Sequence, residues 1–253
     1  MGHIFQVVFY QPILNLLVFL YNTISFHDLG IAIILLTIII KGLLWPLSQK
    51  SIKAQKALQD LQPKINDLKA KYKGDKQQMS LAMMALYKEH KINPMSSCFP
   101  VLLQLPFLWA VFQVFRDGLH SKLDLVYPFI TRPESINMMA FGFLDLSKVN
   151  IYLAILAGLA QFWQTKMMLS RRPTVKTAGS KDEDMAAIMN KQMVYMMPIL
   201  TIFIGISLPG GLTFYWLIVT ILTGVQQVIV FKKHKKANDK LTAEKVIDAE
   251  IVK

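Results

Sequence analysis

The sequence predicts an all-α integral membrane protein with five transmembrane helices, a cytoplasmic helical hairpin and an N-terminal interfacial helix. Three observations lead to this fold class. The chain is 53% hydrophobic over 253 residues, and its mean hydropathy of +0.38 is too high for a soluble domain. Five apolar stretches approach the roughly 20 residues that a helix needs to cross a bilayer. The net charge of +12 lies between these stretches, where basic loops set membrane topology.

The N-terminal residues 1–28 are expected to form an interfacial amphipathic segment on the outer face. Polar residues and Pro12 interrupt the apolar run from Ile4 to Ile24, and no basic residue holds its start in the cytoplasm. A sixth span over this run is the alternative. The remaining segments are expected in this order: first span 29–48, cytoplasmic hairpin 49–92, second span 93–115, outer loop 116–148, third span 149–169, cytoplasmic loop 170–192, fourth span 193–208, fifth span 211–231 and basic cytoplasmic tail 232–253.

The distribution of Lys and Arg fixes the expected orientation. The hairpin, the loop beginning at Lys166 and the tail together hold 23 basic residues, whereas the other side holds only four. The positive-inside rule therefore places the first three in the cytoplasm. We expect a multi-pass membrane protein with a cytoplasmic C-terminus. The same distribution argues against DNA as a partner, because the charge lies where topology requires it.

The hairpin segment carries an apolar stripe at helical spacing. The stripe repeats at steps of three and four residues from Ala54 to Tyr72, and Pro63 should kink it without changing its register. After a turn at Gly74, a second short apolar face follows. Its candidate contact residues are Met79, Met83, Met84 and Leu86. The stripe either holds two antiparallel helices together or offers an adaptable, methionine-rich surface to other proteins.

Lys41 is the candidate at the centre of the expected site. It follows the apolar run from Ile31 to Ile40, and a cation at such depth costs on the order of 3 kcal/mol, which usually marks a functional position. No acidic residue lies in any span to pair with it, so hydration in a water-filled cavity is favoured. In the alternative, its long side chain extends to the cytoplasmic interface, about 9 Å away along the helix axis.

Four expected spans each carry a polar strip that would be costly against lipid. These strips must face one another or face water. Interhelical hydrogen bonds, worth about 0.6 kcal/mol each, are the alternative explanation for any single threonine. The strip residues are Thr37 beside Lys41, then Ser97 and Gln104, then Gln161, Gln164 and Thr165, and finally Thr213, Trp216, Thr220, Thr223 and Gln227.

No catalytic or cofactor motif is present, so neither an enzyme nor a cofactor is expected. The sequence has no zinc-protease, serine-hydrolase or phosphate-loop pattern. The tail contains a basic cluster of Lys232, Lys233, Lys235 and Lys236. This cluster could contact anionic lipid or ribosomal RNA phosphates.

Several motifs in the right order resemble the YidC/Oxa family of membrane protein insertases. They are KGLLWPL (41–47), LQPK (61–64), MMALYK (83–88), INPMSSCFPVLLQLP (92–106) and LPGGLTFYW (208–216), followed by the glutamine pair 226–227. The resemblance implies a five-helix core around a positively charged hydrophilic groove, with a cytoplasmic hairpin in front of it. The implied activity is the insertion and folding of nascent membrane proteins in the lipid bilayer, alone or with the Sec translocon, often from a ribosome. The implied location is the bacterial plasma (inner) membrane.

The resemblance also implies roles for individual positions. Lys41 takes the place of the groove cation, which is usually arginine in the family; a buried lysine can lose its proton, whereas arginine stays charged. Gln104 and Trp216 match the family pattern directly. The family's third-span glutamine falls on Thr165, with Gln164 adjacent. Two competing functions remain at this point, a pore or small-solute transporter and a chaperone for proteins that are already inserted.

Overall fold

The computed structural model of the chain describes residues 2–72, 74–93, 99–169 and 181–251. The described part is helical apart from one two-stranded antiparallel sheet, which confirms the all-α class. The elements are α1 His3–Phe5, η1 Gln6–Tyr10, α2 Gln11–Thr23, α3 Leu29–Leu43, α4 Trp45–Asp60, α5 Gln62–Lys71, α6 Lys76–Glu89, α7 Phe99–Gln113, η3 Val114–Gly118, α8 Leu119–Ser121, η4 Leu123–Leu125, β1 Met139–Ala140, β2 Leu144–Asp145, α9 Ile151–Leu169, α10 Lys181–Gly205 and α11 Gly210–Ile251.

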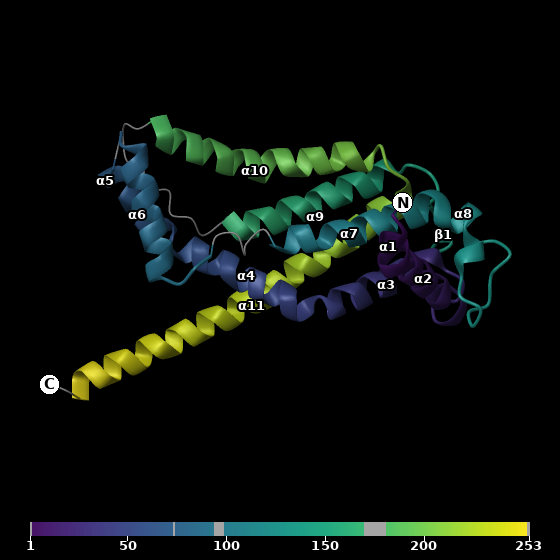
Figure 1. Cartoon of the computed structure of the whole chain (residues 1–253), viewed down its shortest axis with the longest axis horizontal. Coiled ribbons are helices and arrows are strands. Elements are labelled where there is room, and N and C mark those ends of the chain that lie inside the picture. Colours follow the sequence, from purple (N-terminus) through teal and green to yellow (C-terminus); the bar gives the residue numbers. More distant parts are fainter. Residues whose placement is uncertain (1, 73, 94–98, 170–180, 252–253) are drawn as a thin grey trace.

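Helix α9 packs against both α10 and α11; α9 and α10 run along the long axis of the molecule, and α11 runs obliquely to it (Figure 1). Glycines allow the helices to approach closely. A Cβ at Gly158 would lie 2.4 Å from Cγ1 of Ile202 on α10, and one at Gly224 would lie 2.1 Å from Cζ3 of Trp163 on α9. Small residues at these contacts maximise van der Waals packing, which drives helix association in a bilayer.

The first expected span, 29–48, is bent. Helices α3 and α4 meet at an angle of 69° around Leu44. Pro46 lies in the first turn of α4, where its ring excludes the carbonyl of Gly42 from a continuous helix. Beyond the bend, Ile52 on α4 packs against Val230 and Phe231 of α11.

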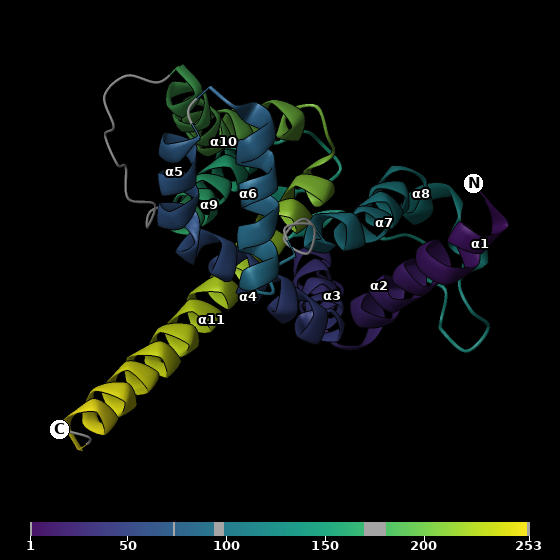
Figure 2. The same cartoon turned by 60° about the vertical axis from the view of Figure 1, so that its left-hand side comes forward.

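Helices α5 and α6 form an antiparallel pair at the end of the molecule from which the C-terminal half of α11 extends (Figures 1 and 2). Gly74 occupies the turn with a positive φ of 94°, and the side chain of Asp75 caps α6 by accepting hydrogen bonds from the amides of Gln77 and Gln78. Leu61, Ile65 and Leu86 form a small core between the helices. The part of the apolar stripe from Leu61 to Leu68 therefore lies inside this pair, whereas Ala54 and Leu58 lie on α4.

The N-terminal helix α2 lies across the opposite end of the molecule. It points along the view in Figure 1 and extends sideways in Figure 2, whereas α9 and α10 follow the long axis. Two polar residues that interrupt its apolar run bind the outer loop. Asn15 donates to the carbonyl of Leu125 over 3.1 Å and accepts from the amide of Tyr127 over 2.6 Å. Asn22 donates to the carbonyl of Thr131.

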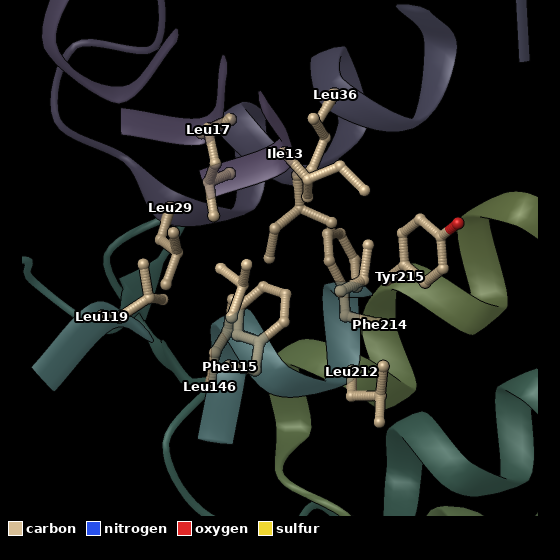
Figure 3. Packing of buried hydrophobic residues seen from close by; sticks show 14 of the residues in the cluster. Ile13, Leu17, Leu29, Leu36, Phe115, Leu119, Leu146, Leu212, Phe214 and Tyr215 are labelled. Atoms are coloured by element: carbon tan, nitrogen blue, oxygen red, sulfur yellow. The ribbon is translucent and has the colours of Figure 1, made fainter. Parts of the chain in front are cut away.

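The main hydrophobic core lies where this crosswise helix meets α3, the end of α7 and the start of α11. Figure 3 shows how side chains from these distant segments meet. Its labelled members are Ile13, Leu17, Leu29, Leu36, Phe115, Leu119, Leu146, Leu212, Phe214 and Tyr215. Burial at this junction holds this end of the helices together.

The outer loop is fixed to the first residues of two helices. The Asp28 carboxylate accepts hydrogen bonds from the amides of Ile31 on α3 and Phe141 in the strand turn. At the other contact, the amide of Gly210 donates to the carbonyl of Lys148 over 2.9 Å. The loop therefore covers this end of the molecule.

The helix lengths differ from the expected segments in two places. Helix α10 begins at Lys181, within the expected loop 170–192, and α11 continues through the expected tail to Ile251. Both extensions are rich in Lys, Ala and Glu, which favour helix over loop. Residues 170–180 of the expected cytoplasmic loop lie outside the described residues.

Within the described ranges, two helices are long and apolar enough to cross a membrane. They are His3–Thr23 and Gly210–Lys233, and the bent pair α3–α4 makes a third if it is one span. Val194–Gly205 is a shorter apolar helix. Helices α7 and α9 occupy the segments expected as the second and third spans. The five-span topology thus stays a prediction, as does the interfacial position of the N-terminal helix.

Candidate functional site

Lys41 and Thr37 lie one turn apart on α3, but their environments differ. Thr37 is fully buried, and its hydroxyl donates to the carbonyl of Ile33 over 2.6 Å. Its polar atom is therefore satisfied by its own helix. Lys41 is half-buried and has no hydrogen-bond or ion-pair partner among the residues that the structure describes. An ammonium with this exposure and no protein partner takes its hydrogen bonds from water or from a bound anion.

Gln104 joins α7 to α11. Its Nε2 atom donates a hydrogen bond of 2.8 Å to the hydroxyl of Tyr215, which is fully buried. Sequence reasoning selected Gln104 and Trp216 as site residues but did not select Tyr215, the partner of Gln104. A signal was available, because a tyrosine inside an apolar helix needs a partner for its hydroxyl. Ser97, expected beside Gln104, lies outside the described residues.

The polar face of α11 is used in three different ways. Thr213 donates to the carbonyl of Gly205 on α10 over 3.1 Å, whereas Thr223 donates to Val219 on its own helix over 2.6 Å. Thr220 is buried, and Trp216 is half-buried. The explanation by interhelical hydrogen bonds thus holds for Thr213 but not for Thr223.

The neighbouring residues Gln226 and Gln227 of α11 are both buried, near the bend between α3 and α4. Gln226 donates to the carbonyl of Trp45 over 3.4 Å. This contact links the middle of α11 to the start of α4. Trp45, the residue contacted, follows Lys41 by four positions. Sequence reasoning placed Gln227 on the polar face and did not single out Gln226.

The polar residues of α9 interact mainly within their own helix. Gln161 and Thr165 lie 3.5 Å apart between Nε2 and Oγ1, and both side chains are half-buried, as is Gln164. The structure gives these three residues no direct bond to Lys41 or Gln104 within the described residues.

The candidate residues of the hairpin divide into interior and exposed positions. Leu86 is buried in the hairpin core and Met83 packs against it, so Leu86 stabilises the hairpin and is not available to another protein. Met79 is half-buried. Met84 is 53% exposed, beside Leu81 at 55%. The accessible apolar surface is therefore smaller than expected and is centred on Met84 and Leu81.

The basic cluster lies on the continuous helix α11. The side chains of Lys232 and Lys233 are exposed, and those of Lys235 and Lys236 lie outside the described side chains. Within the described residues, no group of three or more His, Cys, Asp or Glu side chains could hold a metal ion.

The chain matches the model of the 60Kd inner membrane protein family over residues 19–238. It belongs to this family. The match includes the hairpin, Lys41, Gln104 and Trp216, and it excludes α1, η1 and the first part of α2. The resemblance inferred from the sequence motifs is confirmed, and with it a bacterial membrane protein.

Proteins named "Membrane protein insertase YidC" are similar to this family member over most of its length. The protein of Fusobacterium nucleatum is 35% identical over 226 residues, which are 88% of this chain and 97% of the relative. The protein of Syntrophus aciditrophicus is 37% identical over 88% of this chain, and that of Campylobacter jejuni is 34% identical over 92%. The chain covers only 36% and 39% of these last two relatives.

Proposed function

We propose that this protein is a membrane protein insertase that transfers client transmembrane helices into the bilayer along a hydrophilic groove containing Lys41. The observation that carries the proposal is the half-buried ammonium of Lys41 on an otherwise apolar helix, with no partner among the described residues. The printed names of the relatives support the same activity.

The proposed groove involves α3, α7, α9 and α11. Helix α3 supplies Lys41, and the half-buried side chains of Gln104, Gln161, Gln164, Thr165, Trp216 and Thr223 supply polar surface. Thr37 and Thr220 lie behind that surface, since both are buried. In this proposal the outer loop closes one end, because it is hydrogen-bonded to the first turns of α3 and α11.

The physical role of such a groove is to shorten the path of a polar segment. A client with a short polar outer tail must move it across about 30 Å of hydrocarbon. Lys41 would attract acidic residues of that tail with roughly 4 kcal/mol at 4 Å and an effective dielectric constant of 20. This attraction is strong enough to recruit the tail without trapping it. Burial of the client's apolar helix in lipid then makes release favourable.

The same proposal assigns the two ends of the molecule to the two sides of the membrane. The hairpin and the basic C-terminal half of α11 extend from one end, and α8 and the strand pair lie at the other (Figure 1). We place the first end in the cytoplasm, where the hairpin and the lysine cluster can meet the ribosome, anionic lipid and the Sec translocon. We place α2 on the outer surface, since it runs crosswise.

Insertion into proteoliposomes that contain only this protein tests the proposal. The client is a single-span protein with an acidic outer tail, and protease protection reports its insertion. Lys41→Ala should reduce insertion, whereas Lys41→Arg should preserve it. Lys50→Ala, which removes an exposed lysine of α4, is the matched control. Equal insertion by wild type and Lys41→Ala would overturn the groove mechanism, and solute flux without a client would favour a pore.

A further inference from the structure

A cavity of about 460 Å³ lies between the N-terminal helix and the outer loop, away from Lys41. It is lined by Gln6, Tyr10, Ser121, Lys122, Asp124 and Leu125. From η1 and α8–η4, these residues bring together an ammonium, a carboxylate, a hydroxyl and an amide. Because Gln6 and Tyr10 precede the family match at residue 19, this cavity is not explained by the family assignment.

The two charged residues of the cavity form no close ion pair within the described part of the chain, although Lys122 lies within electrostatic reach of Asp117 and adds to the hydrogen bond from Arg116 in lowering the pKa of that carboxyl. Neither Lys122 nor Asp124 has an ion-pair partner among the residues that the structure describes, although both line the same space. The nearby Asp117 is bound by Arg116 through two hydrogen bonds of 2.9 and 2.8 Å. A cation and an anion that share a cavity without pairing offer complementary positions to a ligand that carries both signs of charge.

Tyr10 forms one wall and positions the cation. The Lys122 Nζ atom lies 5.7 Å from the centroid of the Tyr10 ring, a distance at which the ring attracts the ammonium. Tyr10 is completely buried, and its hydroxyl has no hydrogen-bond partner among the described residues. A buried hydroxyl without a partner is uncommon in proteins.

An apolar surface accompanies the cavity on the same helical segment. Ile4 is 78% exposed, Val7 46% and Val8 55%, and these residues flank Gln6 of the cavity. Polar recognition groups beside exposed aliphatic side chains fit an amphipathic ligand, with a headgroup in the cavity and acyl chains against the helix.

The Ser121 hydroxyl donates to the carbonyl of Asp117 over 2.8 Å, so Lys122 is the phosphate partner in the cavity. From this arrangement we propose that the cavity binds one aminophospholipid, with its phosphate at Lys122 and its primary ammonium at Asp124. The depth of the site in the headgroup layer rests on the proposed outer position of α2. Phosphatidylethanolamine has the required chemistry. Phosphatidylglycerol lacks the ammonium, and phosphatidylcholine has a quaternary nitrogen that cannot donate a hydrogen bond to Asp124.

Native mass spectrometry of the full chain in detergent tests this proposal without using insertion activity. The protein is titrated with phosphatidylethanolamine, phosphatidylcholine or phosphatidylglycerol of identical acyl chains, and the first bound lipid is measured. Phosphatidylethanolamine should bind about two- to fivefold more tightly than the other two, the range that a solvent-accessible ion pair supplies. Asp124→Asn should abolish this preference, and Lys122→Gln should weaken binding of all three lipids.

The double substitution Arg132→Gln with Glu134→Gln is the matched control. It removes a basic and an acidic residue at the same two-residue spacing, from the exposed part of the same loop, and should change nothing. Equal binding of the three lipids by wild type, or an equal loss in the control, would overturn the proposal. Displacement by soluble glycerophosphoethanolamine alone at equal concentration would also overturn it, because the ligand would then be a free solute.

Discussion

The Nε2 atom of Gln104 donates a 2.8 Å hydrogen bond to the hydroxyl of Tyr215 and thereby joins α7 to α11 across 111 sequence positions. Tyr215 is fully buried, whereas Gln104 is half-buried. The bond therefore lies between two regions. One is the hydrophobic core where α2 crosses the other helices, and the other is the more accessible polar surface that includes Gln104.

Removing either partner of this bond should destabilise the protein. Gln104→Ala should lower the free energy of unfolding by about 1–3 kcal/mol, because the buried hydroxyl of Tyr215 loses its partner. Tyr215→Phe should lower it by about 0.5–1.5 kcal/mol, because the half-buried Gln104 can turn to water instead. The double variant should be less destabilised than the sum, which a double-mutant cycle in nanodiscs would show. Tyr152→Phe, at a position 75% exposed, is the control. Full additivity of the two substitutions would mean that the bond contributes nothing.

Gly210→Ala should separate α11 from the outer loop. A Cβ there would lie 2.8 Å from the carbonyl oxygen of Lys148, and backbone atoms cannot move aside as a side chain can. We expect a loss of about 1–3 kcal/mol, typical of overpacking, measured as the unfolding free energy. Gly42→Ala is the matched control, since nothing lies within 4 Å of its added Cβ. A wild-type stability for Gly210→Ala would show that the loop yields at no cost.

The two roles of the hairpin face can be separated by a pair of substitutions. Leu86→Ala should unfold the hairpin locally, because truncating a buried leucine costs about 2–5 kcal/mol. Met84→Ser should leave hairpin protection in hydrogen exchange unchanged and reduce client crosslinking to α6. If Met84→Ser leaves crosslinking at the wild-type level, the exposed methionine is not a contact site and the stripe serves the hairpin alone.

Acid should loosen the outer loop near Asp145. Hydrogen bonds from Ser147, together with Lys148, lower the pKa of this carboxyl from 3.8 to about 2. A depressed pKa in the folded state means that the stabilisation is complete above about pH 4 and is lost as the pH falls toward 2. Hydrogen exchange of the Ser147 amide should accelerate across this window relative to an unstructured reference peptide. In Asp145→Asn that pH-dependent step should be absent.

Insertion should depend on alkaline pH through Lys41. A lysine ammonium can lose its proton, whereas the guanidinium of arginine remains charged. Wild-type insertion of acidic-tailed clients should therefore fall at high pH before circular dichroism shows loss of helix, and Lys41→Arg should keep its activity there. The same decline in both proteins would assign the pH effect to another group.

Local sequence patterns were sufficient for the helical class and the family. Hydropathy marked the apolar segments because lipid and core burial both demand them, and the lysine at position 41 was conspicuous because its surroundings are so apolar. The stripe from Ala54 to Tyr72 likewise indicated helices with one buried face. The helical extensions at Lys181 and beyond Lys232 were missed because charge was read as loop, although Lys, Glu and Ala favour helix.

The sequence by itself determined the helical class, which segments are apolar, where the basic charge lies and which cation is exceptional, because these properties depend on residues close together in the chain. Only the tertiary structure decided the partners. It paired Gln104 with Tyr215, used Asn15 to hold the outer loop, bent the chain at Leu44 and buried Leu86. Such choices depend on which distant surfaces meet, and neither periodicity nor composition contains that information.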